Sequence, residues 1–376
     1  MYIRQKHIDN LATLLKPGKA VIIYGARRTG KTTLVNEYLR GHGEEALSVS
    51  GEDIDVRQYL SSQSTEKLSA FVGKKRLLVV DEAQKVPDIG LNLKLILDYR
   101  PDMRIIATGS SSFDLARNIG EPLTGRKYTL RLFPLAQMEL SAIENPAQTS
   151  SRLESRLLYG SYPEIVLMED NRGREHYLKE IVSSYLYKDI LELDGIRHAS
   201  RITRLLQLIA FQLGREVSFS ELAGHLGMSK NTVERYLDLL EKAFVLIRMH
   251  GFSRNLRKEI TKNCRLYFID TGIRNALVNN FNVLDMRDDA GMLWENYLVM
   301  ERLKKQEYMG DGANNYFWRT YSKQEIDLVE ERGGKLFGYE MKWGRQRAKA
   351  PPEWLKSYPE ASWQAVSRDN YIEFIT

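Results

Sequence analysis

The sequence predicts an α/β fold with a parallel sheet, because three apolar runs of strand length each end in polar residues. Residues 20–24 lead straight into GARRTGKT, residues 77–80 end in Asp81 and Glu82, and residues 103–107 end in TGSSS. Continuous apolar runs of this length are typical of strands buried on both faces. Ligands bind at the carboxyl ends of parallel strands, so these polar ends form the candidate site.

The composition is that of a folded chain with more than one domain. At 376 residues the chain exceeds what one hydrophobic core usually serves, so we expect two or three domains. Apolar residues make up 43% and charged residues 28%, a balance typical of soluble globular proteins. Apolar runs fall short of the roughly 20 residues of a membrane helix, so we expect a cytoplasmic protein without a membrane partner.

Two counts limit the chemistry further. The single cysteine, Cys264, excludes an intrachain disulfide, and the six histidines lack the spacing of a metal site. The net charge of +6 permits binding to nucleic acid without requiring it.

The segment GARRTGKT has the full P-loop pattern and directly follows the first apolar strand. Gly25 and Gly30 permit the tight loop, Lys31 reaches the terminal phosphates, and Thr32 offers its hydroxyl to magnesium. Residues 33–40 suit the helix whose N-terminus assists anion binding. The sequence therefore predicts binding of ATP and Mg²⁺. The predicted nucleotide-binding residues are Gly25, Ala26, Arg27, Arg28, Thr29, Gly30, Lys31, Thr32 and Thr33.

The second strand resembles a Walker B strand. Its Asp81 is expected to hold magnesium together with Thr32, and Glu82 to orient or deprotonate the attacking water. Adjacent acids, and an extra strand expected between this strand and the P-loop strand, favour an ATPase over a nucleotide kinase. The absence of an NKxD motif favours ATP over GTP.

Two further candidates carry open alternatives. Ser110 and Ser111, after the third strand, either sense the γ-phosphate or cap the following helix. Arg126, in the segment TGR, is either an arginine finger acting in cis or in trans, or a salt-bridged surface arginine.

The sequence of the middle of the chain predicts helices followed by a winged helix-turn-helix. Residues 150–195 have helical apolar periodicity, with a turn at Gly160, Tyr162 and Pro163. In residues 218–243, Ser220 is expected to cap a first helix and Ser229 a second, with the turn at Gly227. Strands at 245–249 and 266–269 would frame a basic wing. This module either binds double-stranded DNA or serves as a connector or protein-binding module. The basic residues of the wing are Arg254, Arg257, Lys258 and Lys262.

The last segment predicts an amphipathic helix at residues 291–304 and then a β-rich region. Glu340 and Lys342 lie two apart on one strand and so share a face, with Asp327 across the hairpin and Glu295 on the helix. Carboxylates with a lysine can hold magnesium and activate a water against a phosphodiester. The alternatives are a degenerate, non-cleaving site and an ordinary ionic strand face.

On these segments the chain resembles a bacterial and archaeal family of AAA-superfamily ATPases with a C-terminal domain of unknown function. The matching stretches are GARRTGKTTL, LLVVDEAQKV, TGSSSFDLAR, LTGRKYTLRLFPL, LYFIDTGIRNAL, WENYLVMERL and EIDLVEERGGKLFGYEMKW. The resemblance implies an ATPase, a winged helix and a PD-(D/E)xK nuclease-like end. The family usually has a proline and a lysine before the LYFIDTG strand, where this chain has Asn263, Cys264 and Arg265.

The sequence thus predicts a P-loop AAA-type ATPase domain at 1–140, a helical connector at 141–200, a winged helix at 201–275 and a small restriction-endonuclease-like α/β domain at 285–376. The predicted catalytic residues are Lys31, Glu82, Ser110 and Arg126; Thr32 and Asp81 hold the ATP-linked magnesium, and the candidate second metal site comprises Glu295, Asp327, Glu340 and Lys342. The expected function is an ATPase coupled to DNA binding or processing. The alternative is an ATP-switched, protein-binding regulator whose nuclease-like domain cuts nothing. The sequence leaves the oligomeric state open.

Overall fold

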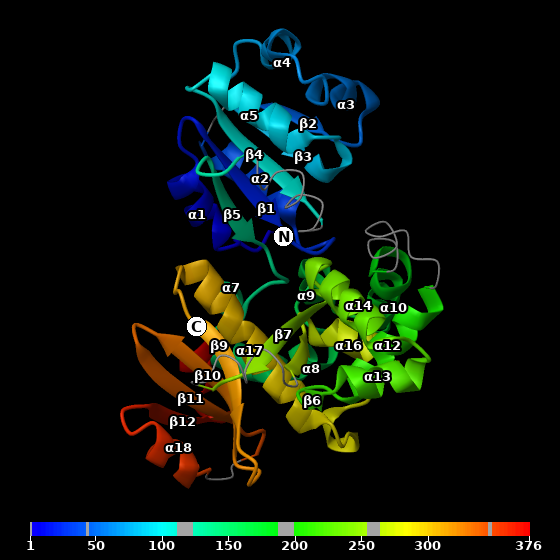
Figure 1. Cartoon of the computed structure of the whole chain (residues 1–376), viewed down its shortest axis with the longest axis vertical. Coiled ribbons are helices and arrows are strands. Elements are labelled where there is room, and N and C mark those ends of the chain that lie inside the picture. Colours follow the sequence, from blue (N-terminus) through cyan, green and yellow to red (C-terminus); the bar gives the residue numbers. More distant parts are fainter. Residues whose placement is uncertain (1, 43–44, 111–122, 187–198, 254–263, 345–347) are drawn as a thin grey trace. The chain divides into compact units, whose positions relative to one another are not determined.

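The structure is a computed structural model that describes residues 2–42, 45–110, 123–186, 199–253, 264–344 and 348–376. The chain divides into a first unit, built mainly from residues up to Pro134, and a second unit that begins at Leu135. The described residues from 141 onward fall in this second unit except Lys242–Phe244 (Figure 1), and the three C-terminal domains expected there stay a prediction. No helix in the described part of the chain is long and apolar enough to cross a membrane.

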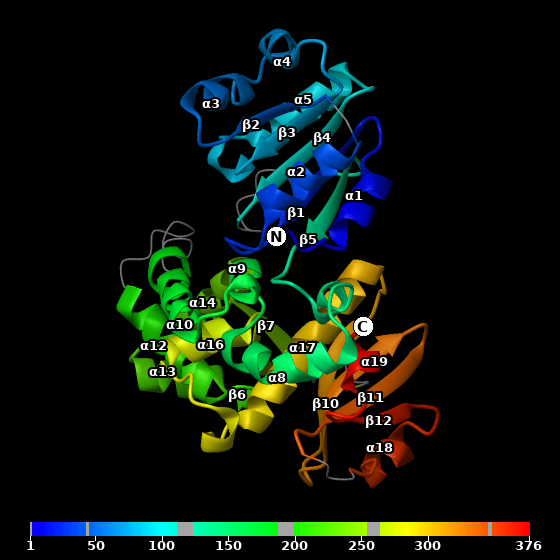
Figure 2. The ribbon, with the colours of Figure 1, turned by 180° about the vertical axis from the view of Figure 1, so that it is seen from behind.

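The first unit contains a five-stranded parallel sheet in the order β2-β3-β4-β1-β5 (Figure 2). Its strands are β1 (Lys19–Tyr24), β2 (Leu47–Ser50), β3 (Leu77–Asp81), β4 (Arg104–Gly109) and β5 (Lys127–Arg131). The three strands expected from the apolar runs are therefore confirmed as β1, β3 and β4. The extra strand expected between the P-loop and Walker B strands is also confirmed, because β4 pairs with both β1 and β3.

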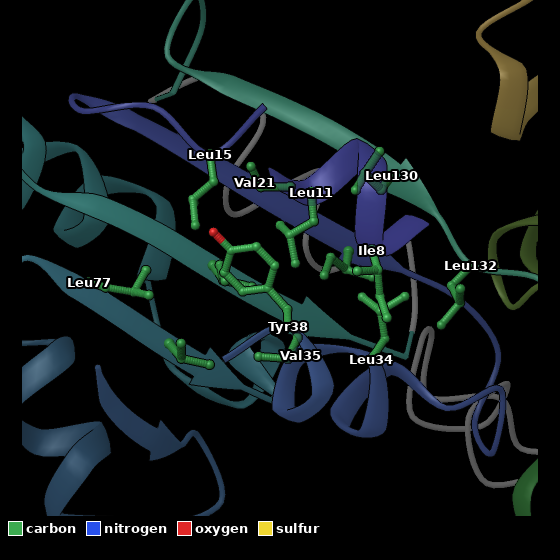
Figure 3. Packing of buried hydrophobic residues seen from close by; sticks show 13 residues of the cluster. Ile8, Leu11, Leu15, Val21, Leu34, Val35, Tyr38, Leu77, Leu130 and Leu132 are labelled. Atoms are coloured by element: carbon green, nitrogen blue, oxygen red, sulfur yellow. The ribbon is translucent and has the colours of Figure 1, made fainter. Parts of the chain in front are cut away.

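Helices cover this sheet and bury its alternating side chains. They are α1 (His7–Leu14), α2 (Lys31–His42), α3 (Ile54–Leu60), α4 (Thr65–Val72) and α5 (Ile89–Tyr99), with a short 3₁₀ helix η1 (Ala83–Lys85). On one face, Leu11 of α1 and Leu34 and Tyr38 of α2 pack against Val21 and Ile23 of β1 (Figure 3). Because side chains alternate along a strand, Ala20 and Ile22, fully buried as well, belong to the opposite face.

The second unit combines helices with one mixed sheet of seven strands. The helices are α7 (Gln137–Leu140), α8 (Pro146–Tyr159), α9 (Pro163–Leu167), α10 (Asn171–Glu180), α12 (Ala199–Phe211), α13 (Phe219–Leu226), α14 (Lys230–Lys242), α16 (Thr271–Leu277), α17 (Ala290–Met309), α18 (Pro352–Ser357) and α19 (Tyr371–Ile375), with a π-helix η2 (Ile181–Leu186) and a 3₁₀ helix η3 (Leu284–Met286). The strands are β6 (Glu216–Val217), β7 (Leu246–Gly251), β8 (Cys264–Phe268), β9 (Asn314–Arg319), β10 (Glu325–Arg332), β11 (Lys335–Met341) and β12 (Ser362–Val366).

These strands follow the order β12-β11-β10-β9-β7-β8-β6. Short parallel pairing of β7 with β9, at His250 with Tyr316 and Gly251 with Phe317, joins the helix-turn-helix region to the C-terminal hairpin. The two regions that the sequence separates at 201–275 and 285–376 thus share one continuous sheet. The aromatic and aliphatic side chains of Trp318, Ile326 and Trp354 form a local core beside it.

The two helices expected within residues 218–243 are present as α13 and α14. Gly227 ends α13 in a left-handed conformation (φ 60°), and the Ser229 hydroxyl accepts a hydrogen bond from the backbone N–H of Thr232 at the start of α14. The expected cap at Ser220 is wrong. Ser218 has the extended backbone of a capping residue and its hydroxyl accepts from the N–H of Glu221, so α13 begins earlier.

The helix expected at 291–304 exists, but its expected amphipathic character is wrong. Helix α17 is longer and is buried on all sides, with Leu293, Trp294 and Leu298 as well as the polar Asn296 and Glu301 shielded from solvent. A helix buried all round has no solvent stripe, which is why its sequence periodicity is weak. Ser111 and the four basic residues expected in the wing lie outside the described residues.

Gly25, directly after β1, is fixed by its close approach to β5. A Cβ atom at this position would lie 2.2 Å from the carbonyl oxygen of Leu132. The backbone N–H of Leu132 donates to the oxygen of Tyr24 at 2.6 Å, which holds the two segments together. The glycine therefore sets both the turn and the spacing of two neighbouring strands.

We expect Gly25→Ala to destabilise the first unit by about 1–3 kcal/mol, because its methyl group must push the backbone of Leu132 away. Gly41→Ala is the matched control: its Cβ meets nothing within 4 Å. Alanine in this helix is expected to be neutral or to stabilise by up to about 1 kcal/mol. Urea unfolding followed by circular dichroism measures both.

Tryptophan fluorescence separates the units in the same titration, because all five tryptophans belong to the second unit. The fluorescence transition should stay in place in both variants. An unchanged first-unit transition in Gly25→Ala would contradict the packing argument.

Candidate functional site

The P-loop turns sharply between β1 and α2. Gly30 has a φ of +94° and Arg28 a φ of 65°, so two residues of the loop adopt left-handed conformations. Helix α2 begins at Lys31, which places the N-terminus of a twelve-residue helix at the end of the loop. Backbone N–H groups of such a loop and helix start form an anion-binding concavity.

Lys31 folds back over this loop. Its ammonium donates to the carbonyl oxygens of Gly25 at 2.9 Å and Ala26 at 2.8 Å, and the residue is only 6% exposed. The hydroxyl of Thr29 donates to the same Ala26 oxygen at 2.9 Å. The positive charge is therefore held on the inner side of the loop.

Asp81, at the end of β3, connects the P-loop helix to the central strands. Its Oδ2 accepts a hydrogen bond from the hydroxyl of Thr32 at 2.8 Å, and its Oδ1 accepts one from the hydroxyl of Thr108 on β4. The structure thus brings together Thr32 and Asp81, the pair expected from the sequence. Sequence reasoning missed Thr108, whose only signal is its position before the glycine that ends β4.

Glu82 follows in a left-handed conformation with a φ of 49°. Its backbone N–H donates to the Thr108 hydroxyl at 3.3 Å, so the residue is tied to the end of β4. The side-chain amide Nε2 of Gln84 donates to Glu82 Oε2 at 2.6 Å and to Ser110 Oγ at 3.1 Å. The predicted residues Glu82 and Ser110 are therefore joined through Gln84, which the sequence reasoning did not select.

Arg126 does not reach this edge of the sheet. Parallel pairing sets Lys127 beside Ala20, and the N–H of Ala20 donates to the oxygen of Arg126, so Arg126 lies at the amino end of β5. The P-loop lies at the carboxyl end, roughly 20 Å away along the strand. The arginine forms an ion pair with Asp98. The expected finger role in cis is therefore wrong; a role in trans stays a prediction.

The segment before α1 supports the loop from the other side. Gln5, which is buried, donates from its amide Nε2 to the carbonyl oxygen of Thr29 at 2.9 Å. His7 lies 2.9 Å from the carbonyl oxygen of Arg131 through Nε2, and burial lowers its pKa to about 4. A neutral imidazole therefore donates to β5 near the loop. No motif in the sequence marks either residue.

Two of the four C-terminal candidates, Glu295 and Asp327, bond to one arginine. Arg265, on β8, is 3% exposed and donates to Glu295 at 3.3 Å and to Asp327 at 3.2 Å from one nitrogen, and to Glu325 at 3.0 Å from another. Its guanidinium also lies 4.9 Å from the ring centre of Phe317. These contacts link strands β8, β9 and β10 with helix α17.

Two acids of this region hold their protons to a higher pH than usual. Burial, with the nearby charge of Asp327, raises the pKa of Glu295 to about 8 and that of Glu340 to about 7. Glu295 accepts from the Tyr267 hydroxyl at 2.7 Å, and Glu340 from the Lys342 ammonium at 2.6 Å. The second oxygen of Asp327 accepts from the backbone N–H of Met341 at 2.9 Å.

This arrangement corrects the expectation of a second metal site at Glu295, Asp327, Glu340 and Lys342. Within the described residues, no three histidine, cysteine or acidic side chains group as a metal ion would need. The physical reason is Arg265, whose guanidinium lies between Glu295 and Asp327 and bonds to both.

Comparison with protein families divides the chain into three matches. Residues 17–141 match an AAA domain, residues 150–284 match a domain of unknown function (DUF8612), and residues 290–367 match a second domain of unknown function (DUF4143).

The relatives found in the comparison carry the description "uncharacterized protein". A protein of Mycobacterium tuberculosis is 28% identical over 347 residues, covering 90% of this chain and 74% of the relative. One from Methanocaldococcus jannaschii is 24% identical over 334 residues, covering 84% of this chain and 73% of the relative.

Two solved structures are weakly similar to this chain. The Holliday junction branch migration motor RuvB of Thermotoga maritima has a TM-score of 0.34 at 17% identity, covering 66% of this chain and 90% of that one. AMPPCP-bound DnaA from Aquifex aeolicus has a TM-score of 0.27 at 16% identity, covering 63% and 84%. The match of residues 17–141 to an AAA domain agrees with the five-stranded parallel sheet of the first unit, and the match to DUF4143 lies within the second unit.

Proposed function

We propose that the first unit binds ATP with magnesium and hydrolyses it. The observation that carries the proposal is the hydrogen bond between Thr32 and Asp81 beside the inward-turned Lys31. Hydroxyl and carboxylate oxygens are the ligands that Mg²⁺ prefers, so this donor set fits the ion. When bound, magnesium neutralises charge on the phosphates.

The protein's own groups have separate roles in this proposal. The loop N–H groups and the N-terminus of α2 bind the phosphates, with Lys31 exchanging its carbonyl partners for phosphate oxygens. Glu82 orients the attacking water and accepts its proton. Ser110, buried at the end of β4, lies on the same edge and is proposed to sense the γ-phosphate.

We further propose that duplex DNA is the partner of the second unit. Helix α14 buries Val233, Leu237 and Leu240, which leaves Lys230 and Arg235 exposed on its other face. The short strand β6 pairs with β8, and β8 pairs with β7, in the antiparallel order of a winged helix. This helix has three basic and three acidic side chains, so the proposal rests on its place as the second helix of the pair, which suits a major groove. Oligomerisation stays a prediction.

One observation favours a second function for the C-terminal part, namely binding without cleavage. A phosphodiester-cleaving site needs carboxylates that are free to hold a cation. Here Glu295, Glu325 and Asp327 already form ion pairs with Arg265. This supports the regulator alternative, with the nuclease-like region as a rigid recognition platform.

The central test is magnesium-dependent ATP hydrolysis. Lys31→Ala should abolish nucleotide binding, because the loop loses its phosphate-binding charge. Glu82→Gln should keep binding but lower kcat by about 10²–10⁴-fold, because proton transfer to the carboxylate is lost. Lys67→Ala and Glu66→Gln, on exposed positions of α4, are the matched controls and should behave as wild type.

Each protein is assayed with and without duplex DNA. Stimulation by DNA supports the coupling. ATP binding without turnover, indifferent to DNA, would contradict the ATPase proposal and favour a nucleotide-gated switch.

We expect Arg265→Met to destabilise the second unit by about 3–5 kcal/mol, because the buried carboxylates bonded to Arg265 lose their partner. Arg319→Met is the control: Arg319, 39% exposed in its side chain, pairs with Glu216 at 2.7 Å. Its loss should cost below about 1 kcal/mol. Urea unfolding followed by tryptophan fluorescence measures the second unit alone.

The same comparison has a pH dependence. The folded pKa values of Glu295 and Glu340 lie above their ordinary value of 4.5, so their contribution to stability falls as pH rises from 4.5 toward 8. The deficit of Arg265→Met should therefore be larger at pH 8 than at pH 5. Equal deficits at both pH values would mean that the arginine acts through packing and not through charge.

We expect no cleavage of supercoiled or linear duplex DNA by the wild-type chain with either Mg²⁺ or Mn²⁺, because the guanidinium holds the carboxylates. Lys342→Ala should give the same background as wild type in a plasmid-nicking assay. Metal-dependent nicking that survives in Glu82→Gln and disappears in Lys342→Ala would establish a nuclease and reject the non-cleaving proposal.

A further inference from the structure

Gln84 occupies a distinctive position between the two predicted catalytic groups of the ATPase edge. It lies in η1, two residues after Glu82, and its Nε2 donates to both Glu82 Oε2 (2.6 Å) and Ser110 Oγ (3.1 Å). Both hydrogens of the amide nitrogen are thereby used. Because a carboxylate only accepts hydrogen bonds, the contact with Glu82 fixes which end of the amide is nitrogen.

The oxygen of the same amide, Gln84 Oε1, is buried. Gln84 Oε1 makes no hydrogen bond to any residue that the structure describes. A buried acceptor without a donor is unfavourable, so a donor that reaches it is bound favourably. The vacant oxygen lies on the same side chain that holds Glu82.

The backbone of Glu82 is held in place on both sides. Its N–H is bonded to Thr108, and its carbonyl oxygen lies against Gly51, where a Cβ atom would come within 2.4 Å. The Glu82 carboxylate itself accepts a hydrogen bond from the Gln84 amide, which restricts its direction.

We propose that Gln84 is a catalytic residue of ATP hydrolysis, which orients Glu82 through Nε2 and accepts a hydrogen bond from the attacking water through Oε1. The inference rests on the proposed function. One hydrogen of the water points to Glu82 and the other to Gln84, which turns an oxygen lone pair toward the γ-phosphorus.

The step balances as an ordinary hydrolysis. The water oxygen forms a bond to the γ-phosphorus while the bond from that phosphorus to the β,γ-bridging oxygen breaks. Glu82 receives one proton and returns it to the products, ADP and phosphate. Gln84 changes neither its charge nor its covalent structure, so its effect is geometric and electrostatic.

The test compares steady-state ATPase kinetics of Gln84→Met, Gln84→Glu and wild type, all as full-length chains with Mg²⁺. Methionine keeps the length of the side chain without either hydrogen bond, and kcat should fall about 100-fold. Glutamate replaces the donor by a charge that repels Glu82, so kcat should fall at least as far. The affinity for ATP, measured by titration with a fluorescent nucleotide, should change less than about threefold.

The contrast between kcat and nucleotide affinity distinguishes this role from a structural one. Gln84→Met should lower kcat and leave the affinity for ATP near that of wild type, because the lost interaction with the water is one that stabilises the transition state. Gln58→Met, an exposed position of α3, is the matched control and should show no change in either readout.

The outcomes separate the inference from the function on which it rests. Wild-type activity that persists in Gln84→Met, while Glu82→Gln is inactive, overturns the inference and leaves the ATPase intact. Loss of nucleotide binding in Gln84→Met overturns it too, since the residue would then be structural. If the wild type hydrolyses no ATP, both fall together.

Discussion

The hydrogen bonds accepted by Asp81 are the interaction on which the first unit's candidate site depends. One oxygen takes the Thr32 hydroxyl from the start of α2, and the other takes the Thr108 hydroxyl from β4. Three segments that are far apart in the sequence are thereby fixed at one sheet edge. They can meet only because β4 lies between β1 and β3 and all three strands run parallel.

Sequence patterns predict most of this edge, because its signals are local. A buried parallel strand reads as a short apolar run, and the residue that follows it must lie at the carboxyl edge. That logic places Lys31, Asp81 and Ser110 correctly. It fails for Arg126, whose position depends on the register of β5 against β1. It also passes over Gln84, whose hydrogen bonds join Glu82 and Ser110, the residues that follow two different strands.

The second unit is less predictable, because its decisive contacts join distant segments. The sequence indicates the strands and the acids but not the pairing of β7 with β9 that merges two expected domains into one sheet. In the sequence, Arg265 is only a departure from a family pattern. Nothing there indicates that its guanidinium would bond to carboxylates of α17 and β10. Helix α17 shows the same limit, since burial on all sides erases the periodicity that sequence reasoning relies on.

Comparing the two acid sites explains why one suits a cation and the other does not. Asp81 accepts hydrogen bonds from hydroxyls, which are neutral, so a divalent ion beside it adds attraction without displacing a charged group. Asp327 accepts from a guanidinium that is 97% buried and anchored by two further acids. A cation entering there would have to expel that charge into an apolar surrounding, at a cost of several kcal/mol. The similar carboxylates of the two units therefore differ in chemistry through their partners alone.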